Sequence, residues 1–551
     1  MKRASLLGIL VVLFCLPVLV AACGEGSDGT GGRAAANGGV GGTSSAGTSA
    51  GGTTPGAGNG SGGAQGGSGN AGGVETGGDP AGGAETGGTS PATGGVGPSG
   101  GGGTAGSSAT GGRGGAAPMG GAGGSGGGAQ GGSGGAVSCT ITATHTRSTA
   151  ISTVEIVTFT TSLAGIASAH IDFGLAGSAP TMSAPVSLSE PSYRTLLLGM
   201  KAARDYVFRI VATSAAGTCT SQDYTLTTGA LAANAPRVTR TVMNAAAQDR
   251  GFIVTSGGVA GGMGSGVPAY IIDADGDVVW WAPAPMSTSR ALMSYDGKDM
   301  YMMALNVTNQ SMNGEMRKVS MDGMTTENNL SGLNAGHHDF TVLPDNGIAV
   351  IVWANMCSSI VERSASGQLT TVVANVNTLY RTSNECHTNA IHYYPADQTY
   401  TLSDRNVNAF VKIRRTGQLI WQFGGANPMG QAFTGSQSWT VNHGHQYLSD
   451  GTFIFFNNGP MQGGMSAALA YTLNETSWTA TKASWEYRVT GVNSAVLSDV
   501  QRLPNGNTLV TYSTAGQIHE VSPAGQLVQR VQASSFGYAE FRKSLYGPPL
   551  R

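Results

Sequence analysis

Six of the nine histidines of the chain fall in three short segments, 336–347, 385–394 and 442–451. His338 lies nine residues before the turn glycine that ends the first segment, and His443 lies eight residues before the glycine that ends the third. His387 holds the same place ahead of a degenerate turn at Pro395–Asp397. Each segment reads as a strand that runs into a turn, so we expect the three imidazoles at equivalent positions of neighbouring repeat units, facing one another.

Arg405 follows on the next strand after His387 and is expected to point to the same place. Three imidazoles around a guanidinium suit an oxyanion, because arginine offers a planar fork to sulfate or phosphate oxygens and histidine can donate, accept or attack. A neutral imidazole becomes a nucleophile once its other ring nitrogen is oriented. Two other interpretations stay open. Each histidine pairs with the backbone at a strand end, or the three bind a metal ion with Asp339, although the charge of Arg405 opposes a cation. The other histidines of these segments are expected to point mostly into the sheets: His337, His392 and His445.

These segments belong to an internal repeat that starts near Val238. Each unit opens with a short strand, turns at a Pro/Asp/Asn-Gly pair and continues through a β-branched strand and a second hairpin, with a spacing of about 50 residues. Six such units fill 238–551, which predicts a six-bladed β-propeller around a central channel, with seven blades or an open array as alternatives. The first strands of all blades line such a channel, so the histidine positions converge at one of its mouths.

Residues 139–230 read as a separate set of short alternating strands. The stretch 196–213 resembles the fibronectin type III signature, in which a Leu-x-Gly-Leu turn leads to a corner tyrosine before an Arg-x-x-Ala strand. Tyr206 holds that place, and its hydroxyl is expected to be hydrogen-bonded back to the chain. The predicted fold class is therefore all-β: a propeller preceded by a fibronectin type III-like β-sandwich and a disordered Gly-rich linker.

The first residues read as an export signal. A basic pair precedes an apolar run at 6–20, and Leu-Val-Ala-Ala-Cys at 19–23 resembles the bacterial lipobox, whose cysteine is lipidated. We expect a lipoprotein signal peptide at 1–22 and a lipid anchor on Cys23, with an ordinary signal peptide as the alternative. Gly24 is not the aspartate that retains lipoproteins at the inner membrane, which favours the outer membrane, on its periplasmic or its surface face.

Residues 23–138 form a tract of glycine, serine, alanine and threonine. Between Gly24 and Gly135 lie 51 of the 89 glycines, seven charged residues and no aromatic residue. Such a stretch cannot bury enough apolar surface to offset its chain entropy, so we expect it to be a disordered tether.

Composition narrows the classes of partner. A formal charge of −2 with 11% charged residues gives no basic surface for nucleic acid. No apolar run after the signal reaches the roughly 18 residues of a spanning helix, so the lipid anchor is the expected membrane contact. No cofactor and no metal are expected. A metal site built from the four thiolates of the body is disfavoured, because the sequence has no Cys-x-x-Cys spacing.

Four cysteines lie in the body of the chain. In an oxidising compartment an even number favours disulfides. Position along the chain suggests Cys139 with Cys219, across the ends of the small domain, and Cys357 with Cys386, beside the histidine segments. Other pairings stay open.

The motifs in the second half resemble those of the bacterial arylsulfotransferases (aryl-sulfate sulfotransferases). In the stretch 386–425, His-Thr-Asn-Ala, Ser-Asp-Arg and Ile-Trp-Gln-Phe-Gly-Gly stand where that family has His-x-Asn-Ser, Ser-x-Arg and Ile-x-Trp-x-x-Gly-Gly. The segments 337–340, 442–459 and 498–507 resemble its His-His-Asp, Gln-His … Phe-Asp-Asn-Gly and last-blade motifs. The resemblance covers about 238–551 and implies a six-bladed propeller with an N-terminal β-sandwich.

The same resemblance implies transfer of a sulfuryl group from an aryl sulfate donor to a phenolic acceptor, without a nucleotide, through a sulfohistidine. On this basis His443 is the expected nucleophile. His338, His387 and Arg405 are expected to hold the sulfuryl oxygens and to offset charge in the transition state. Asn389 would orient a neighbouring side chain. One of the histidines would protonate the leaving phenolate and later deprotonate the acceptor.

Two departures from the family pattern widen the set of candidates. His445 competes with His443 for the nucleophile's place, since a Gly-His pair replaces a polar-Ala pair. An extra residue in the turn after His338 likewise makes His337 its competitor. Together with Asn389, His337 and His445 are kept as candidate substrate contacts. The alternative function is a catalytically silent binding propeller at the cell surface, and a metal-assisted hydrolase is a more distant one.

Overall fold

The computed structural model describes residues 138–258, 266–284, 286–305, 314–354, 357–380, 386–460 and 464–550. The predicted signal peptide, the lipidation site Cys23 and the glycine-rich linker lie outside these residues. In the described part every regular element is a β-strand or one of three short 3₁₀ turns, which confirms the all-β class. No helix in this part is long and apolar enough to cross a membrane. The turns are η1 (Pro191–Tyr193), η2 (Ala245–Ala247) and η3 (Val376–Leu379).

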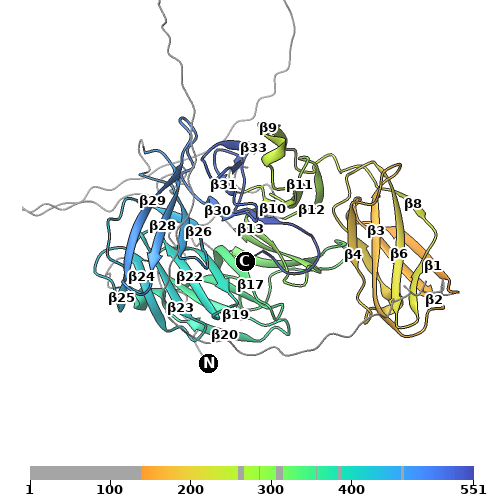
Figure 1. The fold of residues 1–551 in the computed structure, drawn as a ribbon. Coiled ribbons are helices and arrows are strands. Elements are labelled where there is room, and N and C mark those ends of the chain that lie inside the picture. The colour runs from red at the N-terminus through yellow and green to blue at the C-terminus, as the bar shows by residue number, and fades with distance from the viewer. Residues whose placement is uncertain are drawn as a thin grey trace, which may run out of the picture. The chain divides into compact units, whose positions relative to one another are not determined.

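Two sheets form the part of the chain before residue 230 (Figure 1). Side chains along β6 alternate between buried and partly exposed because one face of its sheet packs on the core. The first sheet has the order β1-β2-β5, with β1 (Ile141–Arg147), β2 (Glu155–Thr161) and β5 (Thr195–Leu197). The second has the order β4-β3-β6-β7, with β8 also on β6; its strands are β3 (Ile166–Leu175), β4 (Met182–Pro185), β6 (Asp205–Ser214), β7 (Gly217–Thr220) and β8 (Tyr224–Thr227).

Both sheets contribute to one buried core around the fully buried Phe208. The predicted disulfide between Cys139 and Cys219 is present, with a Cα–Cα distance of 6.0 Å. The hydroxyl of Tyr206 accepts a hydrogen bond from the backbone N–H of Lys201 at 2.8 Å. This bond back to the chain is the contact expected of a corner tyrosine, whereas the fibronectin type III relationship itself stays a prediction.

From Thr239 onward the strands form sheets arranged around a common centre, a propeller-like arrangement (Figure 1). Their pairing is antiparallel except between β24 and β25. One sheet has the order β12-β11-β10-β34, with β10 (Phe252–Ser256), β11 (Ala269–Asp273), β12 (Val278–Ala282) and β34 (Glu540–Arg542). The next is eight-stranded: β13 (Ser287–Met293), β14 (Asp299–Leu305), β15 (Gly314–Ser320), β16 (Thr326–Glu327), β17 (Gly336–Val342), β18 (Ile348–Ala354), β19 (Cys357–Arg363) and β20 (Leu369–Val373). Its two halves are joined by one residue pair, Gly314 with Gly336.

Three further sheets complete this region. The first contains β21 (Thr388–Tyr394), β22 (Thr399–Asp404), β23 (Ala409–Arg414), β24 (Leu419–Gly424) and β25 (Gln431–Ala432). The second contains β26 (Asn442–Tyr447), β27 (Thr452–Asn457), β28 (Ala467–Asn474) and β29 (Thr479–Tyr487). The third contains β30 (Asp499–Arg502), β31 (Thr508–Tyr512), β32 (Gln517–Val521), β33 (Leu527–Gln532) and β9 (Thr239–Val242).

The two ends of this region close the ring. Strand β9, at its start, pairs with β33, whereas β34, near its end, pairs with β10. Along the centre, β13 contacts β17, β17 contacts β21, β21 contacts β26 and β26 contacts β30. These strands therefore place equivalent positions of successive sheets side by side.

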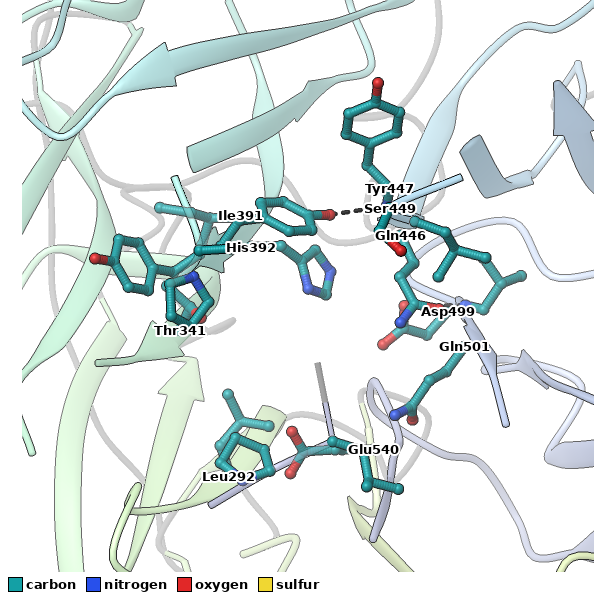
Figure 2. A pocket seen from close by; sticks show the side chains of 18 of the residues that line it. Leu292, Thr341, Ile391, His392, Gln446, Tyr447, Ser449, Asp499, Gln501 and Glu540 are labelled. Atoms are coloured by element: carbon teal, nitrogen blue, oxygen red, sulfur yellow. Dashed lines mark hydrogen bonds between the residues drawn. The ribbon is translucent and has the colours of Figure 1, made fainter. Parts of the chain in front are cut away.

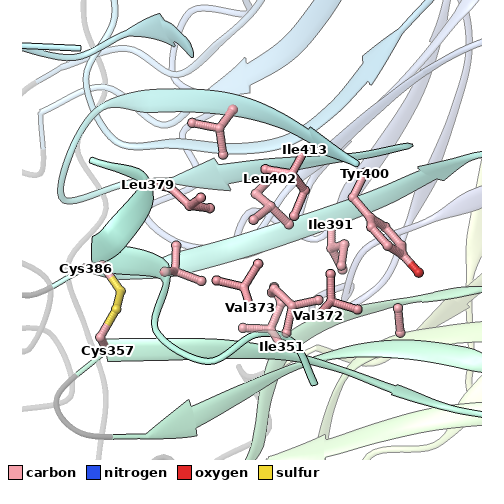
Figure 3. Close-up of a cluster of buried hydrophobic side chains, with 14 of the residues drawn as sticks. Ile351, Cys357, Val372, Val373, Leu379, Cys386, Ile391, Tyr400, Leu402 and Ile413 are labelled. Carbon is pink, nitrogen blue, oxygen red and sulfur yellow. A yellow bond between two sulfur atoms is a disulfide. The ribbon is translucent and has the colours of Figure 1, made fainter. Parts of the chain in front are cut away.

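The hydrophobic cores lie between successive sheets. In the cluster of Figure 3, Ile351 of β18 packs with Ile391 of β21 and with Leu402 of β22, all of them buried. The second predicted disulfide, Cys357 to Cys386, lies at the edge of this cluster, with a Cα–Cα distance of 4.9 Å. It ties β19 to the residue that precedes His387, so both predicted pairings are confirmed.

Candidate active site

The three histidines in register lie together at the start of neighbouring central strands. His338 is in β17, His387 directly precedes β21 and His443 is in β26. The ring centroids of His338 and His387 are 4.7 Å apart, and those of His338 and His443 are 6.4 Å apart. The structure therefore brings the three imidazoles together, as their spacing in the sequence predicted.

A local irregularity accompanies each of these histidines. The pairing of its strand with the neighbouring strand shifts register within a few residues of the imidazole. His338 itself has a backbone φ of 61°, a left-handed conformation that is uncommon outside glycine. A β-bulge adds one residue to a strand and changes the direction in which its side chains point. The nine residues between His338 and its turn glycine, against eight for His443, come from the turn instead. Both histidines lie two residues before the point where regular pairing resumes, at Phe340 and at His445.

A chain of hydrogen bonds connects two of these histidines to β19. Nε2 of His387 lies 3.2 Å from Nε2 of His338, and Nδ1 of His338 lies 2.7 Å from Nδ1 of His337. At the far end, Nε2 of His337 lies 3.1 Å from the hydroxyl of Ser358. Neighbouring side chains therefore occupy both ring nitrogens of His337.

His443 has one ring nitrogen bound and the other bare. Its Nδ1 lies 2.5 Å from Oδ1 of Asn458, whose amide group donates to the backbone carbonyls of Ser494 and Leu497. The amide nitrogen of Asn458 is thus committed, so its oxygen must accept, and the proton of neutral His443 sits on Nδ1. Nε2 of His443 is buried and has no hydrogen-bond partner among the described residues. An unprotonated, oriented and unpaired ring nitrogen is the form of histidine that can attack an electrophile.

Arg405 supplies a fixed positive charge beside these imidazoles. Its side chain is buried, and its backbone N–H donates to the carbonyl of His387 at 3.2 Å. Burial, reinforced by the charge of Arg405, lowers the pKa of His443 to about 3. Burial is also the main cause that holds the pKa of His338 and of His387 well below the usual range of histidine, and the neighbouring imidazoles and Arg405 add to it. The site therefore combines neutral imidazoles with one guanidinium, which suits an anion.

Asp404 binds the backbone next to two residues of the site, at His387 and in the turn after Arg405. One of its carboxylate oxygens accepts from the backbone N–H of His387 at 2.9 Å and from the hydroxyl of Thr388. The other accepts from the N–H groups of Asn406 and Val407, in the turn that follows Arg405. Burial raises the pKa of Asp404 to about 6 despite these donors. This residue stands in the Ser-Asp-Arg motif, but its type alone did not mark it as a positioning group.

The family described as Arylsulfotransferase (ASST) matches residues 265–536, the range that contains all of these groups. The chain belongs to the arylsulfotransferase family. Among curated proteins, none matches its sequence.

Solved structures resemble this arylsulfotransferase-family chain only distantly. A protein of unknown function from Bacteroides caccae is 15% identical, covers 53% of this chain and 98% of its own, and has a TM-score of 0.36. The periplasmic gluconolactonase PpgL of Pseudomonas aeruginosa is 14% identical, with coverages of 53% and 99% and a TM-score of 0.35. A catalytically inactive variant of the virginiamycin B lyase of Staphylococcus aureus, with quinupristin, is 13% identical, with coverages of 56% and 97% and a TM-score of 0.33.

Asn389 lies within the central strands of this arylsulfotransferase-family protein. Its amide nitrogen donates to the backbone carbonyl of Asn442, and its own carbonyl accepts from the hydroxyl of Tyr538 at 2.5 Å. Its Oδ1 is buried and has no partner among the described residues. The side chain of Asn389 is thus tied to the backbone of β26, the strand that carries His443.

His445 and His392 lie apart from the imidazole cluster. Nε2 of His445 lies 2.7 Å from the hydroxyl of Thr401, and its fully buried ring stacks on Phe453. The ring of His392 lies 4.8 Å from that of His445 and lines a separate cavity. His445 therefore packs into a sheet core, as most of the spare histidines were expected to do.

A buried ion-pair network crosses the centre and was not found from the sequence. Nε of Arg290 donates to Asp339 and its Nη1 donates to Asp499, each at 2.6 Å. The guanidinium also lies 4.5 Å from the ring centre of Tyr538. Burial raises the pKa of Asp499 to about 7, although Arg290 opposes that rise. Asp339, which the sequence offered as a possible metal ligand, is thus paired with Arg290. In the sequence, its place next to His338 was the one signal that it lies near the centre of the propeller-like region.

A cavity of about 900 Å³ opens beyond this network, at the far ends of the same central strands (Figure 2). Arg290 and Asp499 line it, but the three clustered imidazoles do not. Five carboxylate side chains and only two cationic ones line it, which disfavours an anionic substrate. The surroundings suited to a sulfate ester are therefore those of the imidazole cluster, at the other ends of these strands.

Proposed function

We propose that this member of the arylsulfotransferase family is a nucleotide-independent sulfotransferase that moves a sulfuryl group from an aryl sulfate ester to a phenolic acceptor. His443 is its nucleophile and carries the group as a sulfohistidine. The observation that carries this proposal is the bare Nε2 of His443, held in one tautomer by Asn458 and buried beside Arg405.

The charges of the site support an anionic substrate. Arg405 offers a guanidinium, and His387 can donate one hydrogen bond to a sulfuryl oxygen. Such donors are most effective when they surround the position where charge develops in the transition state. We therefore assign Arg405 and His387 to the sulfuryl oxygens and His338 to the aryl oxygen. Asn389 positions the strand that carries His443.

In the first half-reaction, Nε2 of His443 forms a bond to sulfur while the bond from sulfur to the aryl oxygen breaks. Protonated His338 gives its proton to that oxygen, and a neutral phenol leaves. The bound sulfate ester carries negative charge that offsets Arg405, which raises the pKa of His338 in the complex and allows it to hold this proton.

In the second half-reaction, the acceptor phenol gives its proton to neutral His338 as its oxygen bonds to sulfur. The bond between sulfur and Nε2 of His443 breaks, and the imidazole returns to its neutral form. His338 thereby regains the proton that left with the first phenol, so the complete cycle consumes no proton.

The finer features of the fold belong to the same proposal. Counting the eight-stranded sheet as two blades joined at Gly314 and Gly336 gives a six-bladed propeller. We propose that residues 139–230 are a fibronectin type III-like spacer and that a lipid on Cys23, followed by the glycine-rich linker, anchors the protein to the outer membrane. The two disulfides support an oxidising compartment.

The full-length chain, mixed with a chromogenic aryl sulfate, is expected to release phenolate faster when a second phenol is added, because transfer regenerates the free enzyme. His443→Ala should abolish release, and digestion of the wild-type protein after donor alone should yield a His443 peptide heavier by one sulfuryl group. His392→Ala, which changes a histidine outside the cluster, is the matched control and should transfer normally.

Folded wild-type protein that shows no turnover with any of several donors would support the binding propeller instead. Transfer that survives in His443→Ala would reject His443 as the nucleophile.

A further inference from the structure

His337 was kept as a candidate substrate contact, but its surroundings leave it no ring atom for that purpose. Nδ1 faces His338 and Nε2 faces the hydroxyl of Ser358. The ring is 1% exposed and packs edge-on against Trp353. Any effect of His337 on the reaction must therefore pass through His338.

We propose that His337 and Ser358 are positioning residues that hold His338 as the acid–base group of the reaction. The Cys357–Cys386 disulfide holds both ends of the hydrogen-bond chain that runs from Ser358 through His337 and His338 to His387. This inference rests on the sulfuryl transfer proposed above. It adds a function to two residues that touch neither substrate nor the nucleophile.

The protons can be placed from the neutral state of His337. Burial lowers the pKa of His337 to about 3, so this ring carries a single proton. When that proton is on Nε2 and is donated to Ser358, Nδ1 of His337 is a bare acceptor that faces Nδ1 of His338. His338 must then keep its own proton on Nδ1. Its Nε2 lies 3.2 Å from Nε2 of His387 and exchanges protons with the substrate oxygen once that oxygen takes the place of this contact.

This arrangement serves both half-reactions. Protonated His338 has two N–H groups, one donated to His337 and one directed at the leaving oxygen. Neutral His338 keeps only the Nδ1 proton, so Nε2 has a lone pair ready for the proton of the acceptor phenol. A reversed chain, with His337 donating to His338, would place the proton of neutral His338 on Nε2 and remove its ability to act as a base.

One covalent bond fixes both ends of the chain. Ser358 follows Cys357 in β19, and its backbone N–H lies 3.2 Å from Sγ of Cys386. His387, whose Nε2 faces that of His338, follows Cys386 directly. The positions of the serine hydroxyl and of the partner imidazole are therefore linked through the disulfide.

The backbone of His338 is held independently. The hydroxyl of Ser289 donates to its carbonyl oxygen at 2.7 Å. The titratable or charged groups around the His338 ring are His337, His387, His443 and Arg405.

The test compares two substitutions of His337. Asn puts a carbonyl oxygen near the place of Nδ1 and so keeps an acceptor for His338, whereas His337→Leu removes it. Both variants and the wild type are assayed with two donors, a nitrophenyl sulfate, whose phenolate leaves without a proton, and phenyl sulfate, whose phenolate needs one. We expect His337→Leu to lower kcat by roughly 10²-fold on phenyl sulfate only, with KM nearly unchanged, and His337→Asn to recover most of that loss.

The pH profile adds a second readout. The acceptor on His337 stabilises protonated His338, so its loss lowers the pKa of His338 in the complex. The alkaline limb of kcat on phenyl sulfate should therefore move to lower pH in His337→Leu and stay near the wild-type position in His337→Asn. Ser358→Ala and the paired Cys357→Ser and Cys386→Ser changes should shift it in the same direction by less.

Equal losses on both donors, or a raised KM with unchanged kcat, would make His337 a structural or substrate-binding residue and overturn the inference. If the wild type transfers sulfuryl groups and every variant behaves as the wild type does, the inference is overturned as well, while the proposed function stands. A wild type inactive on both donors rejects the proposed function and this inference with it.

Discussion

At the level of single residues, the hydrogen bonds of Asn458 decide which nitrogen of His443 can react. The side-chain amide donates to two backbone carbonyls, so it cannot flip by 180° without losing both hydrogen bonds. An imidazole fixed in this way needs no charged partner. Buried carboxylates elsewhere in the site, such as Asp404, bind backbone N–H groups instead.

Asn458→Ala should lower kcat for sulfuryl transfer by up to roughly 10⁴-fold, the loss found when a catalytic histidine loses the partner that fixes its tautomer. The nucleophile then populates the tautomer with the proton on Nε2. The measurement is single-turnover release of phenolate. Asn457→Ala, at the neighbouring position, is the control, since its side chain accepts from the backbone N–H groups of Thr440 and Gly459 rather than from His443. Equal losses in both variants would contradict the assignment.

The role of Asn458 could not be predicted from the sequence. The Phe-Asn-Asn-Gly segment was recognisable as a motif, and the spacing of the histidines was enough to bring His338, His387 and His443 together. The tautomer depends on Ser494 and Leu497, which lie in the approach to the next sheet. No local pattern links an amide to two carbonyls about 40 residues away, so only the folded chain reveals it.

At the level of elements, the bulges of the central strands set the direction of the clustered histidines. In β26 the bulge includes Gly444, between the nucleophile and His445. A Cβ atom at Gly444 would lie 2.2 Å from Oδ1 of Asp499 and 2.7 Å from the backbone oxygen of Ser498. The glycine thus lets β26 and β30 approach closely at the site.

Gly444→Ala should push β26 away from β30, which displaces His443 and weakens its alignment with the sulfur atom. We expect a loss of kcat of roughly 10²-fold, since small misplacements have effects of that size, together with a lower free energy of unfolding. Gly525→Ala is the control, because an added Cβ there meets nothing within 4 Å and costs only the strain of its φ of 78°. Activity retained in Gly444→Ala would mean that β26 adapts to the added methyl group.

The repeat pattern predicted the strands better than it predicted these bulges. Alternating residues and turn glycines mark each hairpin, which is why the all-β class and the repeating hairpins could be predicted from the sequence. A bulge adds one residue without changing residue types, and an extra residue in the turn after His338 left His337 and His338 as competitors. The structure separates them through the left-handed backbone of His338 and the bonds of His337 to Ser358.

At the level of the whole molecule, buried ionisable groups make the fold sensitive to acid. Burial lowers the pKa of His443, His337 and His445 to about 3, far below the 6.5 of an exposed histidine. Between pH 6.5 and 3 these histidines therefore bind protons in the unfolded chain but not in the folded one. The stability present above pH 6.5 is lost as the pH falls towards 3. Asp404 and Asp499 oppose this loss, because burial raises their pKa to about 6 and about 7 and the folded chain takes up their protons first.

Since the depressed histidines outnumber the raised carboxylates, the free energy of unfolding should fall between pH 6.5 and 4. Each histidine contributes about 1.4 kcal/mol per pH unit at most. Urea unfolding across this range, compared with His445→Gln, should show a shallower pH dependence in the variant by about one proton, whatever its absolute stability. An unchanged slope would mean that His445 is protonated within the folded protein.

Closure of the ring ties the folding of this region to the completion of its synthesis. Because β34 supplies an edge strand of the sheet that also contains β10, a ribosome must pass residue 542 before that sheet can be complete. A nascent chain stopped earlier exposes the unpaired edge of β10, onto which another chain can add a strand. The strands between 141 and 227 find all their partners within that range and can pair as soon as they emerge.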